Sequence, residues 1–179
     1  MLNLKDKNFW RAALALALPI AMQNLLTSSF TLVDTIMVGQ LGDVALSSVG
    51  MAGQLSWLLN MVLFGICSGA SIFISQFWGV FDTVNIKKTI GLAAISACII
   101  SSVFLMLGIF VPEKIIHIFN SEPIIISTGA RYLRAVAWSY PAVVLNMVLS
   151  AALRAVERVR IPLATALITT VTNIFLDYA

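Results

Sequence analysis

The stretch TIGLAAISACIISSVFLMLGIFV, residues 89–111, decides the fold class because it contains no charged side chain and is long enough to cross a lipid bilayer. A helix rises about 1.5 Å per residue, so about 20 apolar residues span a hydrocarbon core about 30 Å thick. Similar apolar windows cover residues 12–38, 47–75, 132–153 and 161–179. We therefore predict an all-α integral membrane protein with five transmembrane helices joined by short connections.

The chain is far more apolar than a soluble domain. Of its 179 residues, 60% are hydrophobic and 11% are charged, and its mean hydropathy is +0.97, whereas a soluble domain is about 25% charged. The formal net charge is +3, but Lys and Arg are confined to short segments between the apolar windows. This distribution indicates membrane topology, so we expect the lipid bilayer as a partner and no nucleic acid.

The basic residues also predict an orientation, because the cytoplasmic loops of membrane proteins carry the larger share of Lys and Arg. The smaller group consists of Lys114, Arg131 and Arg134. The larger group consists of Lys5, Lys7, Arg11, Lys87, Lys88, Arg154, Arg158 and Arg160. We therefore expect a multi-pass protein of the cell membrane with a cytoplasmic N-terminus. The last window stops at Ala179 without a polar segment beyond it, which favours a fragment or a truncated gene product.

Two of the predicted helices carry a stripe of polar side chains that ends in an aspartate. The spacing is three or four residues throughout, so each stripe lies on one helical face. The first stripe comprises Asn24, Thr27, Thr31 and Asp34. The second comprises Thr165, Thr169, Asn173 and Asp177.

The two aspartates are predicted to lie at similar depths in the membrane. The helical rise is about 34 Å from Arg11 to Asp34 and about 25 Å from Arg160 to Asp177. Both carboxylates then belong in the outer half of the hydrocarbon core, where they could share one water-filled cavity.

A charged side chain at the centre of a membrane helix costs about 2.5–3.5 kcal/mol, and somewhat less near the interface, so two such residues indicate function. Burial and a second carboxyl group raise a carboxyl pKa, which would let protons bind and leave near neutral pH. Asn173 would add a neutral oxygen beside Asp177, a ligand that also suits sodium. We therefore predict a site for Na⁺ or H⁺ as coupling ion, with no other cofactor.

Structural roles remain alternatives for these polar residues. The aspartates could instead hydrogen-bond neighbouring helices. For five other polar residues, helix packing or hydrogen bonding to the helix's own backbone is at least as good an interpretation as substrate contact. These residues are Asn24, Thr27, Thr31, Thr165 and Thr169.

Other residues within the spans favour structural interpretations. Cys67 and Cys98 lie in apolar runs without metal-ligand spacing, so we expect small hydrophobic side chains there. Pro19 should kink the first helix, because proline removes a backbone hydrogen bond. Gly65 and Gly69 have the spacing of a small-residue face for close helix packing.

Four segments of the sequence are specific enough to suggest a family. They are VDTIMVGQLG at residues 33–42, GASIFISQFWG at 69–79, YLRAVAWSYP at 132–141 and NIFLD at 173–177. With the residues around them, they resemble the N-terminal half of the multidrug and toxic compound extrusion (MATE) family over nearly the whole chain. The first and last segments are the most specific, since each has an acidic residue at the family's position.

The resemblance implies a twelve-helix transporter with two six-helix lobes, which exports organic, often cationic, drugs or toxins in exchange for Na⁺ or H⁺. It implies a cation or proton site at Asp34, Asn173 and Asp177, which would be the metal ligands if sodium is the coupling ion. It also implies a bend at Pro19 and a substrate contact at Asn146. The expected substrate cavity comprises Asn24, Thr27, Thr31, Asn146 and Thr169.

The chain departs from the family pattern in two loops and in length. LRAVERVRIP at residues 153–162 lacks the glycines of the family's LRGxGDTKxP, and GVFD at 79–82 lacks a small residue. Helix six and the second lobe are absent, so this chain alone should not transport substrate.

Three other functions are alternatives. A lipid-linked oligosaccharide flippase of related fold would be expected to line its cavity with cationic residues. An intramembrane aspartyl protease calls for Tyr-Asp and Gly-x-Gly-Asp motifs, but Val33 precedes Asp34 and Leu176 precedes Asp177. An inactive truncated remnant is the third alternative.

Overall fold

The computed structural model describes residues 7–177, without the side chains of residues 8, 9, 12 and 173–177. All regular structure in these residues is helical, which confirms the predicted fold class. The helices are α1 (Lys7–Gly39), α2 (Asp43–Gly79), α3 (Thr83–Phe110), α4 (Pro112–His117), α5 (Pro123–Ala137), α6 (Tyr140–Ala155) and α7 (Arg160–Asp177).

Length and composition qualify α1, α2 and α3 as membrane spans within the described residues, and α5 with α6 forms a fourth if the bent pair is one span. The protein is therefore a multi-pass membrane protein. α7 corresponds to the fifth predicted window but is not among these spans. Its four threonines, Asn173 and its charged ends lower its hydropathy.

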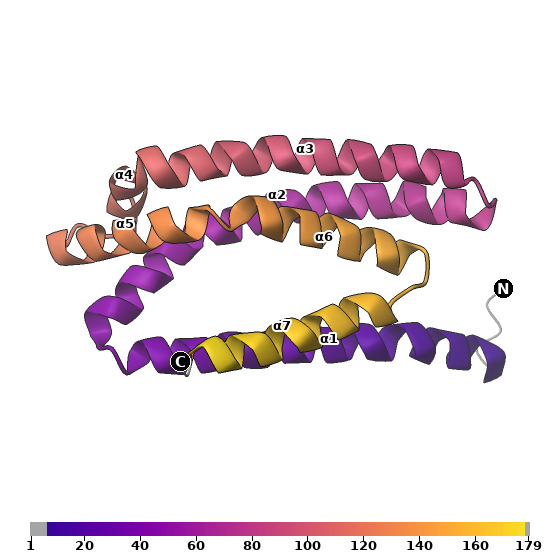
Figure 1. Cartoon of the computed structure of the whole chain (residues 1–179), viewed down its shortest axis with the longest axis horizontal. Coiled ribbons are helices and arrows are strands. Elements are labelled where there is room, and N and C mark those ends of the chain that lie inside the picture. Colours follow the sequence, from indigo (N-terminus) through magenta and orange to yellow (C-terminus); the bar gives the residue numbers. More distant parts are fainter. Residues whose placement is uncertain (1–6, 178–179) are drawn as a thin grey trace.

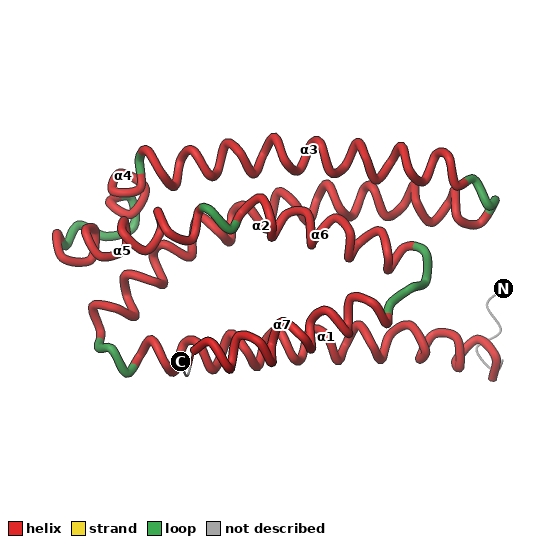
Figure 2. The backbone as a smooth tube through the Cα atoms, in the orientation of Figure 1, coloured by secondary structure: helices red, strands yellow, loops and turns green. Residues whose placement is uncertain are grey.

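The helices form two layers (Figure 1). α2, α3, α5 and α6 pack together in one layer, and α7 lies along α1 in the other. α1 and α7 run in the same direction, and α7 ends beside the C-terminal part of α1. Figure 2 shows that the short loop between α6 and α7 carries the chain from one layer to the other.

The hydrophobic core lies within the larger layer. Leu59 and Leu63 of α2 meet Ala97 of α3, Leu133 of α5 and Val144 of α6, and all five are at most 1% exposed. By contrast, none of the apolar stretch of α1 is buried inside the protein. The α1–α7 layer is therefore joined to the rest of the molecule by few buried side chains.

Close helix packing occurs at glycines other than those expected. A Cβ added at Gly65 or Gly69 would meet nothing within 4 Å among the described residues, so the packing face predicted on α2 is wrong. The close approaches lie at Gly108 and Gly129. A Cβ there would come within 2.7 Å of Ala137 Cβ and within 2.8 Å of Ile116 Cδ1, respectively.

The single helix expected over residues 132–153 is corrected by the structure, which divides it into α5 and α6 with a bend of 53°. Pro141 explains the break, because proline lacks an amide hydrogen and its ring clashes with the carbonyl four residues earlier. At the break, the Val136 carbonyl accepts hydrogen bonds from the Ser139 amide at 2.9 Å and from Ser139 Oγ at 2.7 Å. By contrast, α1 continues as one helix through Pro19.

Both loops that depart from the family pattern contain a residue in the left-handed backbone conformation. Phe81 has a φ of 57° and Glu157 a φ of 62°. This conformation favours glycine, because a Cβ crowds the neighbouring carbonyl. The missing small residues of GVFD and LRAVERVRIP therefore leave two strained positions.

Candidate functional site

The threonine hydroxyl groups along α1 donate hydrogen bonds to the helix's own backbone. Thr27 Oγ1 donates to the Gln23 carbonyl at 3.0 Å, and Thr31 Oγ1 donates to the Thr27 carbonyl at 3.0 Å. Thr165 and Thr169 of α7 make equivalent bonds. Such a hydroxyl has committed its hydrogen, so it presents only acceptor lone pairs to its surroundings.

A cavity of about 240 Å³ lies between α1, α6 and α7, and we call it the threonine cavity. It brings together Thr27, Asn146 and Thr169, three residues of the expected substrate cavity. Asn24 does not line it, and Thr31 lines a different cavity. The remaining walls of the threonine cavity are formed by Gln23, Phe30, Pro162, Thr165, Ala166 and Thr170.

The threonine cavity presents mainly oxygen acceptors on a partly apolar wall. Thr27, Thr165 and Thr169 direct their hydrogens to backbone carbonyls. Asn146 Oδ1 accepts a hydrogen bond from Ser150 Oγ at 3.1 Å, which leaves its amide NH₂ group as a donor. The Phe30 ring adds an aromatic surface, so the cavity combines polar contacts with an apolar wall, as small-molecule sites do.

Asp34 lines a second cavity, of about 530 Å³, between α1, α2 and α5, which we call the aspartate cavity. The Asp34 side chain is half-buried, and Thr31, Thr35 and Tyr132 lie on the same wall. The carboxylate is near enough to the Tyr132 hydroxyl for the two groups to interact electrostatically. Asp34 thus lies in an open recess whose wall combines polar side chains with apolar ones such as Met37 and Leu46.

Asn173 and Asp177, the predicted partners of Asp34, have side chains outside the described part of the structure. Their backbone belongs to α7, which runs parallel to α1 and ends beside its C-terminal part (Figure 1). The helices that carry the two aspartates therefore lie side by side, and the pairing of the carboxylates stays a prediction.

Sequence reasoning missed Tyr132, Gln23 and Arg154. Tyr132 comes to Asp34 only because α5 packs against α2 near the end of α1. Arg154 Nη1 donates a hydrogen bond to Gln23 Oε1 at 3.4 Å and so links the two layers. An arginine at the end of an apolar segment was the available sequence signal for Arg154, but nothing in the sequence indicates its partner.

The cysteines agree with the structural interpretation. Cys67 is buried, Cys98 is partly buried, and both thiols are free. Within the described residues, no group of three or more acidic, His or Cys side chains is arranged to hold a metal ion. The candidate cation site includes Asp177, whose side chain lies outside the described part of the structure.

These features define a class of protein: a polytopic helical membrane protein whose polar cavities lie between two helix layers. Transporters have this arrangement, with binding sites at the interface of moving helix groups.

Comparison with known proteins gives the family. The MatE family model matches residues 19–179, so the chain belongs to the MatE family. The family resemblance is thereby confirmed. Its members are transporters and not enzymes, so the aspartyl protease alternative is excluded.

Three relatives illustrate the similarity. The probable multidrug resistance protein NorM of Thermotoga maritima is 30% identical over 165 residues, which are 92% of this chain and 35% of that protein. The probable multidrug resistance protein YoeA of Bacillus subtilis is 27% identical, over 93% of this chain and 36% of YoeA. The multidrug export protein MepA of Staphylococcus saprophyticus is 24% identical, over 97% of this chain and 39% of MepA. The chain thus spans little more than a third of the length of these relatives.

Proposed function

We propose that this chain forms most of the N-terminal lobe of a cation-coupled antiporter that exports organic, often cationic, compounds across the cell membrane. The position of Asp34 on the wall of the aspartate cavity carries the proposal. A carboxylate in a membrane helix is costly unless it faces water or a partner, and such residues mark ion pathways. Family membership and the multidrug names of the relatives support the substrate class.

Asp34, Asn173 and Asp177 form the cation or proton site in this proposal. The parallel packing of α1 and α7 supports it, because it brings the ends of the two polar stripes to the same region. Carboxylate and amide oxygens suit a hard cation such as sodium. Two neighbouring carboxyl groups would equally hold a single proton, since they resist full ionisation.

The threonine cavity is the proposed substrate site. Its acceptor oxygens and the Phe30 ring suit an organic cation, which an aromatic face attracts electrostatically. Among the described residues, the walls of this cavity and of the aspartate cavity carry no Lys or Arg. That charge pattern favours export of cations over transport of a pyrophosphate-linked oligosaccharide.

Cation binding would change the lobe's preference between inward-open and outward-open states and so expel substrate. Each charge that moves inward across 100 mV supplies about 2.3 kcal/mol. The cycle requires a second lobe against which this one moves. The basic residues at the start of α1 favour a cytoplasmic N-terminus.

The test is Asp34→Asn in the complete transporter that contains this lobe. The amide keeps the size of the side chain but cannot ionise, so we expect cation-driven export of a fluorescent organic cation from proteoliposomes to fall at least tenfold. Asp43→Asn is the matched control, because Asp43 is an exposed acidic residue in the first turn of α2. Normal export by Asp34→Asn at normal protein levels would disprove the coupling role.

A further inference from the structure

A third cavity, of about 430 Å³, lies where the α6–α7 loop meets the beginning of α1. Arg158 and Arg160 line it together with Glu157, and Ala15, Leu16 and Ile161 form its apolar wall. We call it the arginine cavity. Neither the proposed cation site nor the proposed substrate site uses any of these residues.

The charge of the arginine cavity is available to a ligand. Arg158 and Arg160 are exposed, and neither makes an ion pair with a described residue. The Glu157 carboxylate on the same wall offsets one of the two charges. Arg11 adds a further cation, because it lies one helical turn before Ala15 on the same face of α1.

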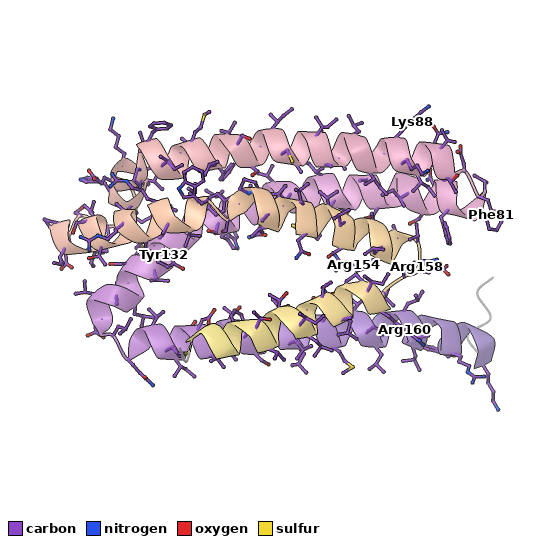
Figure 3. All side chains as sticks on the ribbon, in the orientation of Figure 1. Phe81, Lys88, Tyr132, Arg154, Arg158 and Arg160 are labelled. Atoms are coloured by element: carbon purple, nitrogen blue, oxygen red, sulfur yellow. The ribbon has the colours of Figure 1, made fainter. Side chains whose placement is uncertain are left out.

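The cavity also lies at the level of the membrane surface. The apolar stretch of α1 begins at Ala13, so Ala15 and Leu16 belong to its first turn. Figure 3 places Arg158 and Arg160 at the end of the molecule where α1 begins. The exposed Trp10 is close by in the sequence, and tryptophan favours the membrane interface. The arginines thus lie at headgroup height, with apolar side chains directly below them.

We propose that the arginine cavity binds the phosphate headgroup of an anionic phospholipid. Arg158 and Arg160 bind the phosphate oxygens, for which the planar guanidinium group is well suited. The amides of Arg160 and Ile161 in the first turn of α7 have no acceptor within the helix, so they add donors for the same group, whereas Pro162 has no amide hydrogen. Leu16 and Ile161 contact the upper part of an acyl chain. In the orientation proposed above, the lipid belongs to the cytoplasmic leaflet, which is rich in anionic lipids.

A loop residue distinguishes this site from the family pattern. Arg158 stands where the pattern LRGxGDTKxP has an aspartate, so this chain exchanges a negative charge for a positive one at the cavity wall. Glu157 stands where the pattern has glycine, so the wall still carries both signs, but with Arg158 and Arg160 its net charge is positive.

The test measures lipid binding by the purified, delipidated protein. Native mass spectrometry would follow the binding of phosphatidylglycerol and, in a second arm, of phosphatidylcholine. We expect phosphatidylglycerol to bind at least tenfold more tightly. The double variant R158Q/R160Q should weaken its binding about twenty-five-fold, since each basic residue at a membrane surface contributes a factor of about five.

The matched control is K87Q/K88Q, which removes two exposed basic residues near the start of α3. Figure 3 shows Lys88 at the same end of the molecule as Arg158 and Arg160. We expect the control to leave phosphatidylglycerol binding within a factor of two. An equal loss in both variants would overturn the site, because it would indicate unspecific attraction by the positive surface. No loss in R158Q/R160Q would also overturn it.

Two further measurements keep the proposal testable if R158Q/R160Q does not fold. Ala15→Phe fills the apolar wall without changing any charge, and it should weaken phosphatidylglycerol binding at least fivefold. Soluble glycerol phosphate at millimolar concentration should not displace the lipid. Its displacement of the lipid, or normal binding by Ala15→Phe, would overturn the lipid assignment. Neither readout depends on transport activity.

Discussion

Glu157 shows how a single residue can carry strain in this fold. Its left-handed backbone conformation, with a φ of 62°, costs a residue with a Cβ about 1–2 kcal/mol. Hydrogen bonds on both sides hold it there, from the Glu157 amide to the Arg154 carbonyl at 3.1 Å and from the Arg158 amide to the Leu153 carbonyl at 2.8 Å. The loop geometry is therefore kept although glycine is absent.

Glu157→Gly should stabilise the protein. Glycine relieves the crowding, but it loses about 0.5–1 kcal/mol more conformational entropy on folding, so the net gain in the free energy of unfolding should be about 0.5–1 kcal/mol. Denaturant unfolding in detergent would measure it. Glu157→Ala is the control, because it removes the carboxylate but keeps the Cβ, and it should give no gain. Equal stabilisation by both variants would show that charge, not backbone strain, is the cause.

Asp82 makes the stability of the first turn of α3 depend on pH. It precedes α3, and its carboxylate accepts hydrogen bonds from the Asn85 amide at 3.1 Å and from Asn85 Nδ2 at 2.6 Å. These hydrogen bonds hold the pKa of Asp82 below its ordinary value of 3.8. Because the pKa of Asp82 is lowered by folding, the stabilisation from these hydrogen bonds is complete at pH values above the pKa of Asp82 in the unfolded chain. It is lost as the pH falls through the lower pKa of Asp82 in the folded protein.

We therefore expect the first turn of α3 to loosen as the pH falls below about 3.8. Hydrogen exchange of the amides of residues 83–86, corrected for the intrinsic effect of pH, would measure it. Asp82→Asn should remove this pH dependence. A pH dependence that persists in Asp82→Asn would assign the effect to another group.

At the scale of helices, one of the two close approaches at glycine lies where α3 meets α5. A Cβ at Gly108 would lie 2.7 Å from Ala137 Cβ, a distance at which one helix must shift. Ala137 is itself fully buried and cannot move aside as a flexible side chain would. Glycine at position 108 therefore sets the separation of the two helices.

Gly108→Ala should lower the free energy of unfolding by about 1–3 kcal/mol, the usual cost of overpacking a core. Gly91→Ala is the matched control on the same helix, because a Cβ there meets nothing within 4 Å. The control should be neutral or stabilising by up to about 1 kcal/mol, since alanine favours helix more than glycine does. Similar destabilisation by both substitutions would contradict the proposed packing role of Gly108.

At the scale of the whole molecule, the two layers differ in how firmly they are held. The larger layer has a continuous buried core, whereas the apolar stretch of α1 buries no residue inside the protein. The layers are linked by the hydrogen bond from Arg154 to Gln23 and by the connecting loops. Separating α1 and α7 from the rest therefore exposes little buried surface.

Hydrogen exchange in detergent should accordingly be faster in α1 and α7 than in α2 and α3. Local opening is easiest where few buried contacts are lost. Mass spectrometry of peptides from α1 and from α3 would compare the two layers, and the core peptides of α3 around Ala97 serve as the internal reference. Slower exchange in α1 than in α3 would contradict the two-layer description.

The sequence by itself determined the class of fold and the helix faces that matter. Long apolar windows require helices, because a bilayer offers the backbone no other hydrogen-bond partners. Periodic polar residues placed Thr27, Thr169 and Asp34 on polar helix faces, and these residues do line cavities.

Only the tertiary structure decided which side chains meet. It separated Thr31 and Asp34 from the threonine cavity, joined Tyr132 to Asp34, and replaced Gly65 and Gly69 by Gly108 and Gly129 as close contacts. The periodicity of a helix fixes the direction of a side chain about its own axis. It does not fix the neighbouring helix, which depends on how all the helices pack around the common core.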